Sequence, residues 1–456
     1  MGNLLTSLLN STGALQVYGR EFNTIENNIA NANTPGYAAQ DLPLVALPFD
    51  LANALTGGVG TGPMLSSRSE YLEQSVRNQQ QQLGFAQQQV QDLGQVQPLF
   101  DLTSGAGVAG ALSALFNSFS QLAVNPNDAV ARQSVIAQAG QVAQAFNQNA
   151  LGIQQVSNNA DSQMRDNVTQ INQLAAQIAG INQQFRANSA ATSDAGLDAQ
   201  MHTALENLAQ VANFSIVKTS DGGLNVYLGG QTALVVGENQ YSIQADFSSP
   251  QTAIRDSQGN DITGQVTQGS LGALLHEKNS LLPGYLTQIN TLAQSVADQV
   301  NQGLANGVDP SGAPGTNLFT YHQAGDAAFS LAVSGITPDQ IAAASSGSPG
   351  GNGNAIALAQ LGSAPVLNGF SFTQYYGNLG GQVGRDIDSA KQNQAQYQDA
   401  VTQARQQRAA VSGVDLNAEA AQLLQFQQAY QAVGKLVTVL DSLTQTVIDI
   451  IPATGI

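Results

Sequence analysis

Residues 4–37 read LLTSLLNSTGALQVYGREFNTIENNIANANTPGY, and the apolar side chains of this stretch recur at steps of three and four. This spacing predicts one amphipathic helix with a narrow apolar seam, because residues three and four apart lie on the same helical face. The helix is expected to end between Asn31 and Pro35, since Pro35 disfavours the helical conformation at Thr34 and Pro35-Gly36 is a turn dipeptide. The seam consists of Leu4, Leu8, Leu15, Tyr18, Phe22, Ile25 and Ile29.

The last segment of the chain repeats this pattern. Asp415 is the expected N-cap of a second amphipathic helix, which Pro452 cannot continue. Its seam consists of Leu416, Leu423, Phe426, Tyr430, Val433, Val437, Leu440, Val447 and Ile451, with Glu419 and Thr444 as polar members. Two interpretations are open: an antiparallel helix pair packed on a globular core, or a self-assembling coiled coil whose seams are completed by further copies.

The middle of the chain is rich in Gln, Ala, Leu and Val at helical spacing. Residues 68–100 and 108–190 predict several long helices, broken near Pro98, in the Gly-rich stretch 104–110 and at 125–127. Helical spacing returns at Leu271, with further helices expected at 285–304 and 383–411 and loops at 307–315 and 344–354.

Between these helical regions the pattern changes to short apolar runs separated by Gly and Asp. Residues 214–218 and 224–228 flank Asp221-Gly222-Gly223 and predict a β-hairpin. Further strands are expected at 232–236, 241–245, 251–255 and 261–266. The predicted fold is therefore mostly α with a small β module, in an elongated nested architecture with the terminal helices at one pole and the β module at the tip.

Composition excludes several classes of protein. The 456 residues include 31 acidic and 14 basic side chains, a net charge of −17 that would repel a nucleic-acid backbone. The absence of cysteine excludes disulfides and thiolate metal sites. No apolar run approaches the roughly 18 to 20 residues that cross a membrane, so no membrane association is expected. The first basic residue is Arg20, so the sequence also predicts no cleaved secretory signal.

The sequence offers no constellation for catalysis, for a cofactor or for a metal. Its three histidines, His202, His276 and His322, lack the four-residue spacing of a helical metal pair and are expected to be surface or packing residues. Residues 105–110 satisfy G-x-G-x-x-G, but no strand is predicted before them, and a link between two helices is the simpler interpretation. We therefore expect no enzyme, no cofactor and no metal site.

Two motifs at the ends of the chain carry a resemblance to a known family. Residues 27–37, NNIANANTPGY, closely resemble the motif that ends the N-terminal helix of bacterial flagellar rod, hook and hook-associated proteins. Residues 412–421 and 427–432 (QQAYQA) resemble the C-terminal motif of that superfamily, in the form found in the hook-associated protein 1 family, the hook–filament junction proteins. Residues 38–41, Ala-Ala-Gln-Asp, depart from the Ser-Arg segment common in the family.

The resemblance implies a structural axial protein of the flagellum, built from three domains. Residues 1–35 and 414–456 would form a terminal coiled-coil inner domain, residues 36–213 and 271–413 a helical rod domain, and residues 214–270 a β-rich outer domain. The assembly interface would be formed by the N-terminal seam together with Leu423, Phe426, Tyr430, Val433, Val437, Leu440 and Val447. The turn leaving the inner domain would comprise Asn31, Asn33, Thr34, Pro35, Gly36 and Tyr37.

The resemblance also implies partners and a location. The chain would self-associate in a ring or short helical layer, with hook protein below it and a second junction protein and flagellin above it. An export chaperone would bind the C-terminal helix, and the protein would leave the cell through the flagellar type III apparatus without a cleaved signal peptide. A hook or distal rod protein of the same superfamily is the alternative. From other classes, a peptidoglycan hydrolase would need a catalytic carboxylate pair or metal, and an adhesin would bind a host ligand through residues 214–270.

Overall fold

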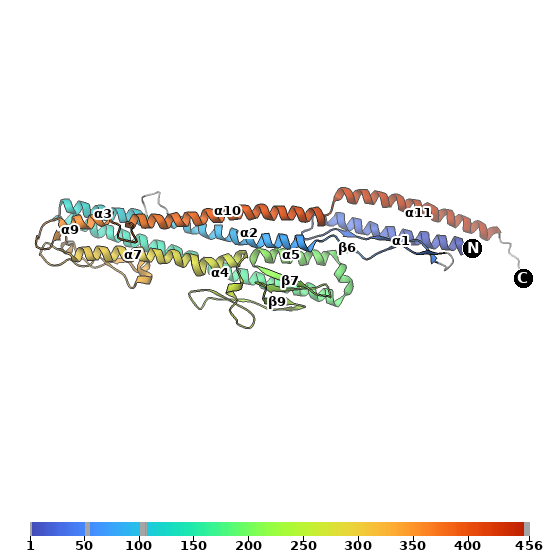
Figure 1. Cartoon of the computed structure of the whole chain (residues 1–456), viewed down its shortest axis with the longest axis horizontal. Helices are drawn as coiled ribbons and strands as arrows, with labels where there is room; N and C mark the ends of the chain where they lie inside the picture. The colour runs from blue at the N-terminus through green and yellow to red at the C-terminus, as the bar shows by residue number, and fades with distance from the viewer. Residues whose placement is uncertain (1, 51–54, 101–104, 106, 451–456) are drawn as a thin grey trace.

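The computed structural model describes residues 2–50, 55–100, 105 and 107–450, and it is an elongated, mostly helical molecule (Figure 1). Helices α1 (Gly2–Asn31) and α11 (Leu416–Ile450) lie side by side at one end, where both termini are found (Figure 1). They run antiparallel, since α1 leads toward the rest of the molecule and α11 leads away from it. The prediction of a mostly α, elongated fold with paired terminal helices and a small β module is confirmed.

The rest of the molecule is a rod of long helices. In it, α2 packs along α10, and α3 packs on α4, which is 59 residues long. Its helices are α2 (Glu70–Val96), α3 (Gly107–Val124), α4 (Ala129–Ala187), α5 (Ala195–Val211), α6 (Gly269–His276), α7 (Leu282–Ala305), α8 (Ala327–Ser330), α9 (Gly353–Leu361) and α10 (Phe372–Ser412). A short π-helix, η5 (Glu277–Leu281), joins α6 to α7.

Helix α4 shows how the sequence determines the helices of this rod. Pro126 prevents continuation from α3, and the Asp128 side chain caps the new helix by accepting a hydrogen bond from the Val130 amide at 2.8 Å. Its apolar residues keep the three-and-four spacing along the whole length, so one face stays buried. That face contributes to one core from Val135 to Val156 and to a second core from Ala160 to Phe185.

The buried side chains of the β module form part of the second core. Its main sheet is antiparallel in the order β10-β9-β8-β7, and β11 pairs with β12 beside it. In β8 the alternating residues Leu224, Val226 and Leu228 are buried, as a half-buried strand requires. The strands are β7 (Phe214–Lys218), β8 (Leu224–Leu228), β9 (Thr232–Val236), β10 (Asn239–Gln240), β11 (Gln244–Asp246) and β12 (Ala253–Arg255).

Two expectations about this module are wrong. Residues 261–266 form no strand: Asp261 makes an isolated bridge to Arg255, and Thr263–Gln265 is a 3-10 turn. The sheet also lies beside α4 and α5, in the half of the rod nearer the termini, and not at the tip (Figure 1). The sheet occupies this side position because its buried side chains share a core with α4, α5 and α6. The division of the chain into three domains stays a prediction.

The far end of the rod is built instead from the loops around α9. They carry the short strands β13 (Gly307–Val308), β14 (Phe319–Thr320), β15 (Ala332–Val333) and β16 (Ala344–Ser345). The predicted loop 344–354 therefore includes a strand and the first residues of α9. Helix α10 begins at Phe372, eleven residues before the predicted start, because Ser371 and Gln374 form a capping box there.

Short paired strands between α1 and α2 had no counterpart among the predicted elements; residues 40–50 and 55–66, which carry them, are named here the ribbon. Strand β1 pairs with β6, β2 with β5 and β3 with β4, and β5 packs on α1. Arg20 of α1 donates to the Thr61 hydroxyl at 3.3 Å. The strands are β1 (Gln40–Asp41), β2 (Leu44–Ala46), β3 (Phe49–Asp50), β4 (Leu55–Thr56), β5 (Val59–Thr61) and β6 (Leu65–Ser66).

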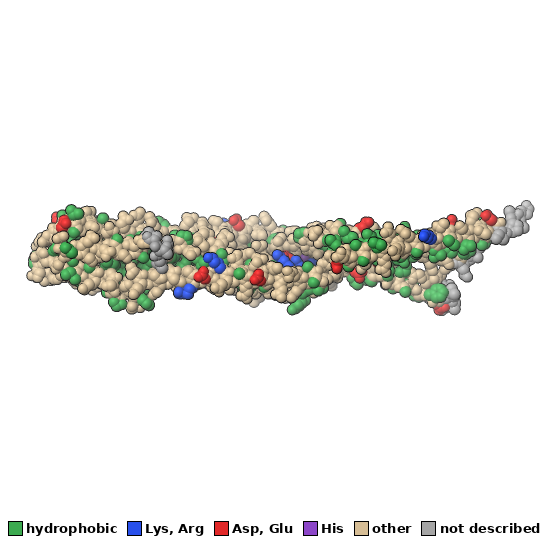
Figure 2. Space-filling view, turned by 90° about the horizontal axis from the view of Figure 1, so that it is seen from above, with side chains coloured by type: hydrophobic (Ala, Val, Ile, Leu, Met, Phe, Trp, Pro, Cys, Tyr) green, Lys and Arg blue, Asp and Glu red, His purple; other side chains and the backbone are tan. Residues whose placement is uncertain are grey.

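Helix α3 corrects another expectation. Over the described ranges it is the one helix long and apolar enough, by length and composition, to cross a membrane, although the sequence analysis found no such window. Its Leu112, Leu115, Phe119 and Leu122 are fully buried in the first core, as in a core helix. The face of the molecule seen in Figure 2 carries few charges, and apolar side chains follow its narrow terminal end.

Candidate assembly interface

The terminal pair brings the two predicted seams face to face. The rings of Tyr18 and Phe426 lie 5.9 Å apart between centroids, as do those of Phe22 and Tyr430. Leu440 is buried, whereas Leu4, Leu8, Leu15, Leu423, Phe426, Val433, Val437 and Val447 are half-buried. One partner helix therefore covers each narrow seam only in part.

Some members of the seams remain exposed. Tyr430 is 42% exposed, Leu416 is 51% exposed, and Ile29 at the end of α1 is 37% exposed, whereas its neighbour Ile25 is buried. Ile451 and Pro452 lie outside the described residues. Asp415 caps α11 as predicted, accepting hydrogen bonds from the amides of Asn417 and Ala418.

Further large apolar side chains of the pair are about half exposed to solvent. They lie beside the seams and point to solvent in this single chain. These residues, named here the outer apolar face, are Leu5, Leu9, Leu424, Leu436, Val439, Leu443 and Ile448, each between 47% and 63% exposed.

The predicted turn docks the end of α1 onto the rod. Asn31 accepts from the Thr34 hydroxyl at 3.0 Å, and the Tyr37 amide donates to the Thr34 carbonyl at 3.1 Å. The Pro35 carbonyl accepts from Thr203 of α5 at 3.2 Å, while Asn33 is exposed. The turn motif thus forms a joint between the terminal pair and the rod.

Gly36 is the one position in this turn that excludes a side chain. Its φ is +75°, a conformation that favours glycine. A Cβ there would overlap the Ala199 carbonyl oxygen and the Thr203 hydroxyl of α5. The close approach of this backbone to α5 therefore requires glycine.

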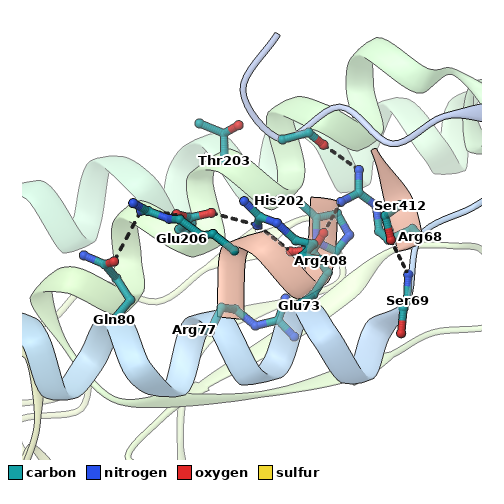
Figure 3. Close-up of polar contacts among 12 residues, drawn as sticks. Arg68, Ser69, Glu73, Arg77, Gln80, His202, Thr203, Glu206, Arg408 and Ser412 are labelled. Atoms are coloured by element: carbon teal, nitrogen blue, oxygen red, sulfur yellow. Dashed lines mark hydrogen bonds and ion pairs between the residues drawn. The ribbon is translucent and has the colours of Figure 1, made fainter. Parts of the chain in front are cut away.

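A network of charged side chains holds the same joint from the rod side (Figure 3). The Arg68 guanidinium donates to the Gly36 carbonyl at 2.6 Å and to the Asp198 carboxylate of α5 at 2.6 and 2.8 Å. It also pairs with Glu73 of α2, whose side chain is only 3% exposed. Arg408 of α10 bridges Glu73 at 3.0 Å and Glu206 of α5 at 2.9 Å.

Two hydrogen bonds made by Ser412 complete the connection. The end of α10 is tied to the residues that flank the ribbon, because the Ser412 carbonyl accepts from the Ala39 amide at 2.9 Å and the Ser412 hydroxyl donates to the Ser67 carbonyl at 3.0 Å. Helices α2, α5 and α10 of the rod and the turn after α1 meet here. The contacts fix the direction of the pair relative to the rod.

His202 lies inside this network and is almost fully buried. Burial, followed by the nearby guanidinium groups of Arg68, Arg77 and Arg408, lowers its pKa well below the usual value, so the imidazole is neutral. His276 packs against Phe85, and His322 is exposed. Within the described ranges no group of three or more His, Cys, Asp or Glu side chains could hold a metal ion.

Sequence reasoning missed a second buried face of α1. Val17, Glu21, Thr24 and Asn28 are buried although they lie outside the predicted seam. Their four-three-four spacing is a helical face, but three of the four are polar, so an apolar pattern could not find it. Glu419, one of the two polar members of the C-terminal seam, was the visible signal of a polar contact at this place.

Comparisons with known proteins agree with this architecture. A family profile described as the helical domain of flagellar hook-associated protein FlgK matches residues 93–319. Profiles for the flagella basal body rod protein and for the C-terminal region of flagellar basal body rod FlgEFG proteins match residues 8–37 and 405–450. The superfamily motifs are thus at the ends, and the middle carries the hook-associated type.

Whole-chain relatives point the same way. Flagellar hook-associated protein 1 of Bacillus subtilis is 26% identical over 96% of both chains, and that of Escherichia coli is 22% identical over 99% of this chain and all of the relative. The solved flagellar hook junction protein FlgK from Burkholderia pseudomallei shares the fold, with a TM-score of 0.68 and 19% identity over 75% of this chain and all of that one. This chain belongs to the flagellar hook-associated protein 1 family, whose members are structural parts of the bacterial flagellum and not enzymes.

Proposed function

We propose that this chain forms the junction between hook and filament, and that its copies assemble by burying the terminal helix pair against one another. The observation that carries the proposal is the outer apolar face together with the half-covered seams of α1 and α11. Large apolar side chains exposed together on one part of a molecule mark an interaction site. In Figure 2 apolar side chains follow the narrow terminal end, whereas the visible face of the rod carries few charged side chains. Assembly is therefore driven by burial and needs no catalysis.

The magnitude supports this mechanism. Fully burying a leucine contributes roughly 1.5 to 3 kcal/mol, so covering a half-exposed one contributes about 1 kcal/mol. Seven such side chains per copy, with the remaining seam surface, provide several kcal/mol for each neighbour contact. Loss of freedom on association opposes part of this gain, which makes a ring of many contacts more favourable than an isolated dimer.

The partners follow from the same position in the flagellum. Copies would form a ring or short helical layer, with hook protein below and a second junction protein and flagellin above. A cytoplasmic chaperone would bind α11 before export, masking Leu436, Val439 and Leu443. Export would use the flagellar type III apparatus without a cleaved signal peptide.

The first experiment is electron microscopy of a strain lacking this protein, with a blot for flagellin in the medium. Completed hooks without filaments, and flagellin lost to the medium, are the expected result. Absent hooks would place the protein lower in the axial structure, and normal filaments would refute the junction role.

A point variant tests the interface itself. Leu443→Asp places a charge on the outer apolar face, where it remains hydrated in the free chain but would be desolvated between copies. We expect the free variant to keep its circular dichroism and thermal unfolding while failing to restore filaments in the deletion strain. Gln431→Asp adds the same charge at an exposed polar position of α11 and should restore them. Restoration by both variants would contradict burial of this face.

A further inference from the structure

A group of polar side chains lies buried where α1, the turn after it and α11 meet. At its centre is Asn28, only 2% exposed. Its amide nitrogen donates to the Gln40 carbonyl and to Glu419 of α11, both at 2.8 Å. Its amide oxygen accepts from the Tyr37 hydroxyl at 2.8 Å and from the Gln40 amide at 2.9 Å. One side chain therefore connects both terminal helices, the turn and β1.

Two carboxyl groups in this contact have an oxygen without a partner. Glu21 of α1 is 5% exposed, and its Oε1 is buried with no hydrogen-bond partner among the described residues. Glu419 uses Oε1 for Asn28, while its Oε2 is likewise buried and unpaired. Burying an ionised carboxylate oxygen without a hydrogen-bond donor costs much free energy, whereas burying the protonated carboxylic acid costs much less.

The surroundings provide no positive charge for these carboxyls. Asp41 from β1 and Asp415 from α11 add negative charge, and β5 contributes no charged residue. Arg20, on α1 itself, donates to Thr61. Over residues 1–66 and 414–456 the sequence has eight acidic residues against two basic ones, Arg20 and Lys435. Ionisation therefore has to be tolerated without an ion pair.

We propose that the contact between α1, α11 and β1 is a proton-regulated latch, closed while Glu21 and Glu419 hold protons and loosened when these carboxyls release them to water. The docked pair takes up protons that the separated helices do not hold, so acid favours docking and alkali favours separation. This regulation lies beyond the junction role and is independent of it.

The titration of the groups supports the direction. Burial, followed by Asp41, raises the pKa of Glu21 to about 7, and burial, followed by the charges of Asp41 and Asp415, raises the pKa of Glu419 despite the hydrogen bond from Asn28. A carboxyl whose pKa is raised in the docked state makes its full contribution to docking when the pH is below its ordinary pKa of about 4.5. That contribution is lost as the pH rises from there to about 7. Neutral to mildly alkaline pH is thus where the latch opens.

Hydrogen exchange of the full free chain tests the latch. Amide protection in α1 and α11, corrected for the intrinsic exchange rate, would be measured at pH 5 and pH 8. We expect protection in the wild type to fall by at least about tenfold across this range. Glu21→Gln, a permanently neutral replacement, should retain most of its protection at pH 8. Glu26→Gln, at an exposed position of the same helix, should behave as the wild type does.

The outcomes separate clearly. Equal protection of the wild type at both pH values, or no protection of the pair at either, would overturn the latch. So would a Glu21→Gln variant that loses protection as steeply as the wild type. Because the measurement uses the free chain, its result does not depend on whether the protein sits at the hook–filament junction.

Discussion

Replacing Glu277 by Gln should stabilise the rod. Glu277 begins the π-helix η5 and is 1% exposed, and neither of its carboxyl oxygens has a hydrogen-bond partner among the described residues. Burial, followed by the neighbouring carboxylate of Asp92, raises its pKa to about 11. The group is therefore protonated in the folded rod at neutral pH and ionised in the unfolded chain.

The size of the effect follows from this difference. Glu277 contributes most to folding stability when the pH is below 4.5, the pKa of this group in the unfolded chain. That contribution is lost as the pH rises toward about 11. At pH 7 the contribution of Glu277 to the free energy of unfolding has fallen by roughly 3 kcal/mol, since each pH unit is worth about 1.4 kcal/mol. Between pH 5 and pH 8 the fall is roughly 4 kcal/mol. Gln carries no such proton and keeps the shape of the side chain, so Glu277→Gln should remove this slope.

Urea unfolding followed by circular dichroism at pH 5, 7 and 8 measures this pH dependence of the free energy of unfolding. The free energy of unfolding of the wild type should fall across this range, while that of Glu277→Gln should fall by several kcal/mol less. Asp166→Asn, which neutralises an exposed carboxyl of α4, serves as the matched control and should follow the wild type. If Glu277→Gln loses stability in parallel with the wild type, Glu277 is not protonated in the folded rod and the reasoning fails.

Five further substitutions, two pairs and one single change, have expected outcomes that thermal unfolding and, for Ile29→Asp, incorporation into the flagellum can check. Arg68→Ala removes the centre of the buried network and should cost roughly 3 to 5 kcal/mol, whereas Arg405→Ala, with its side chain 48% exposed, should cost less than about 1 kcal/mol. Gly36→Ala should cost roughly 1 to 3 kcal/mol or more, because the backbone conformation and the contact with α5 both oppose a side chain. Leu440→Asp should unfold the terminal pair of the free chain, whereas Ile29→Asp, at a 37% exposed position, should alter the free chain little yet still block incorporation into the flagellum.

The following results would contradict these predictions. Equal losses for the two arginine variants would mean that the network is solvated and contributes little. A Gly36→Ala protein as stable as the wild type would show that the turn can move away from α5. Incorporation of Ile29→Asp would remove that residue from the assembly interface.

The sequence was most informative where one periodicity persisted over many residues. The seams of α1 and α11 could be predicted because Leu8 to Ile29 and Leu423 to Val447 repeat one spacing, with only Ser11 and Thr444 as polar members. The strands β7 to β9 were also accessible, since Gly222 and the alternation in β8 are local signals. Local patterns of this kind need no knowledge of which segments meet.

The joint could not be predicted for the opposite reason. Arg68 and Asp198 are 130 residues apart, and Arg408 lies 335 residues after Glu73, so no local pattern connects them. The ribbon was hidden because Pro43 and Pro48 divide it into strands of two or three residues, each too short to give an alternation. Asn28 and Glu21 were missed because an apolar pattern treats buried polar residues as surface.

The single helix α4 has a mechanical consequence. At 1.5 Å per residue its 59 residues span roughly 90 Å, and the same unbroken backbone passes through both hydrophobic cores. The two cores therefore cannot slide or twist past each other without bending a continuous hydrogen-bonded cylinder. A load applied at the far end of the rod would reach the Arg68 joint as elastic strain in α4, so the joint and not the rod is where this molecule should yield under torque.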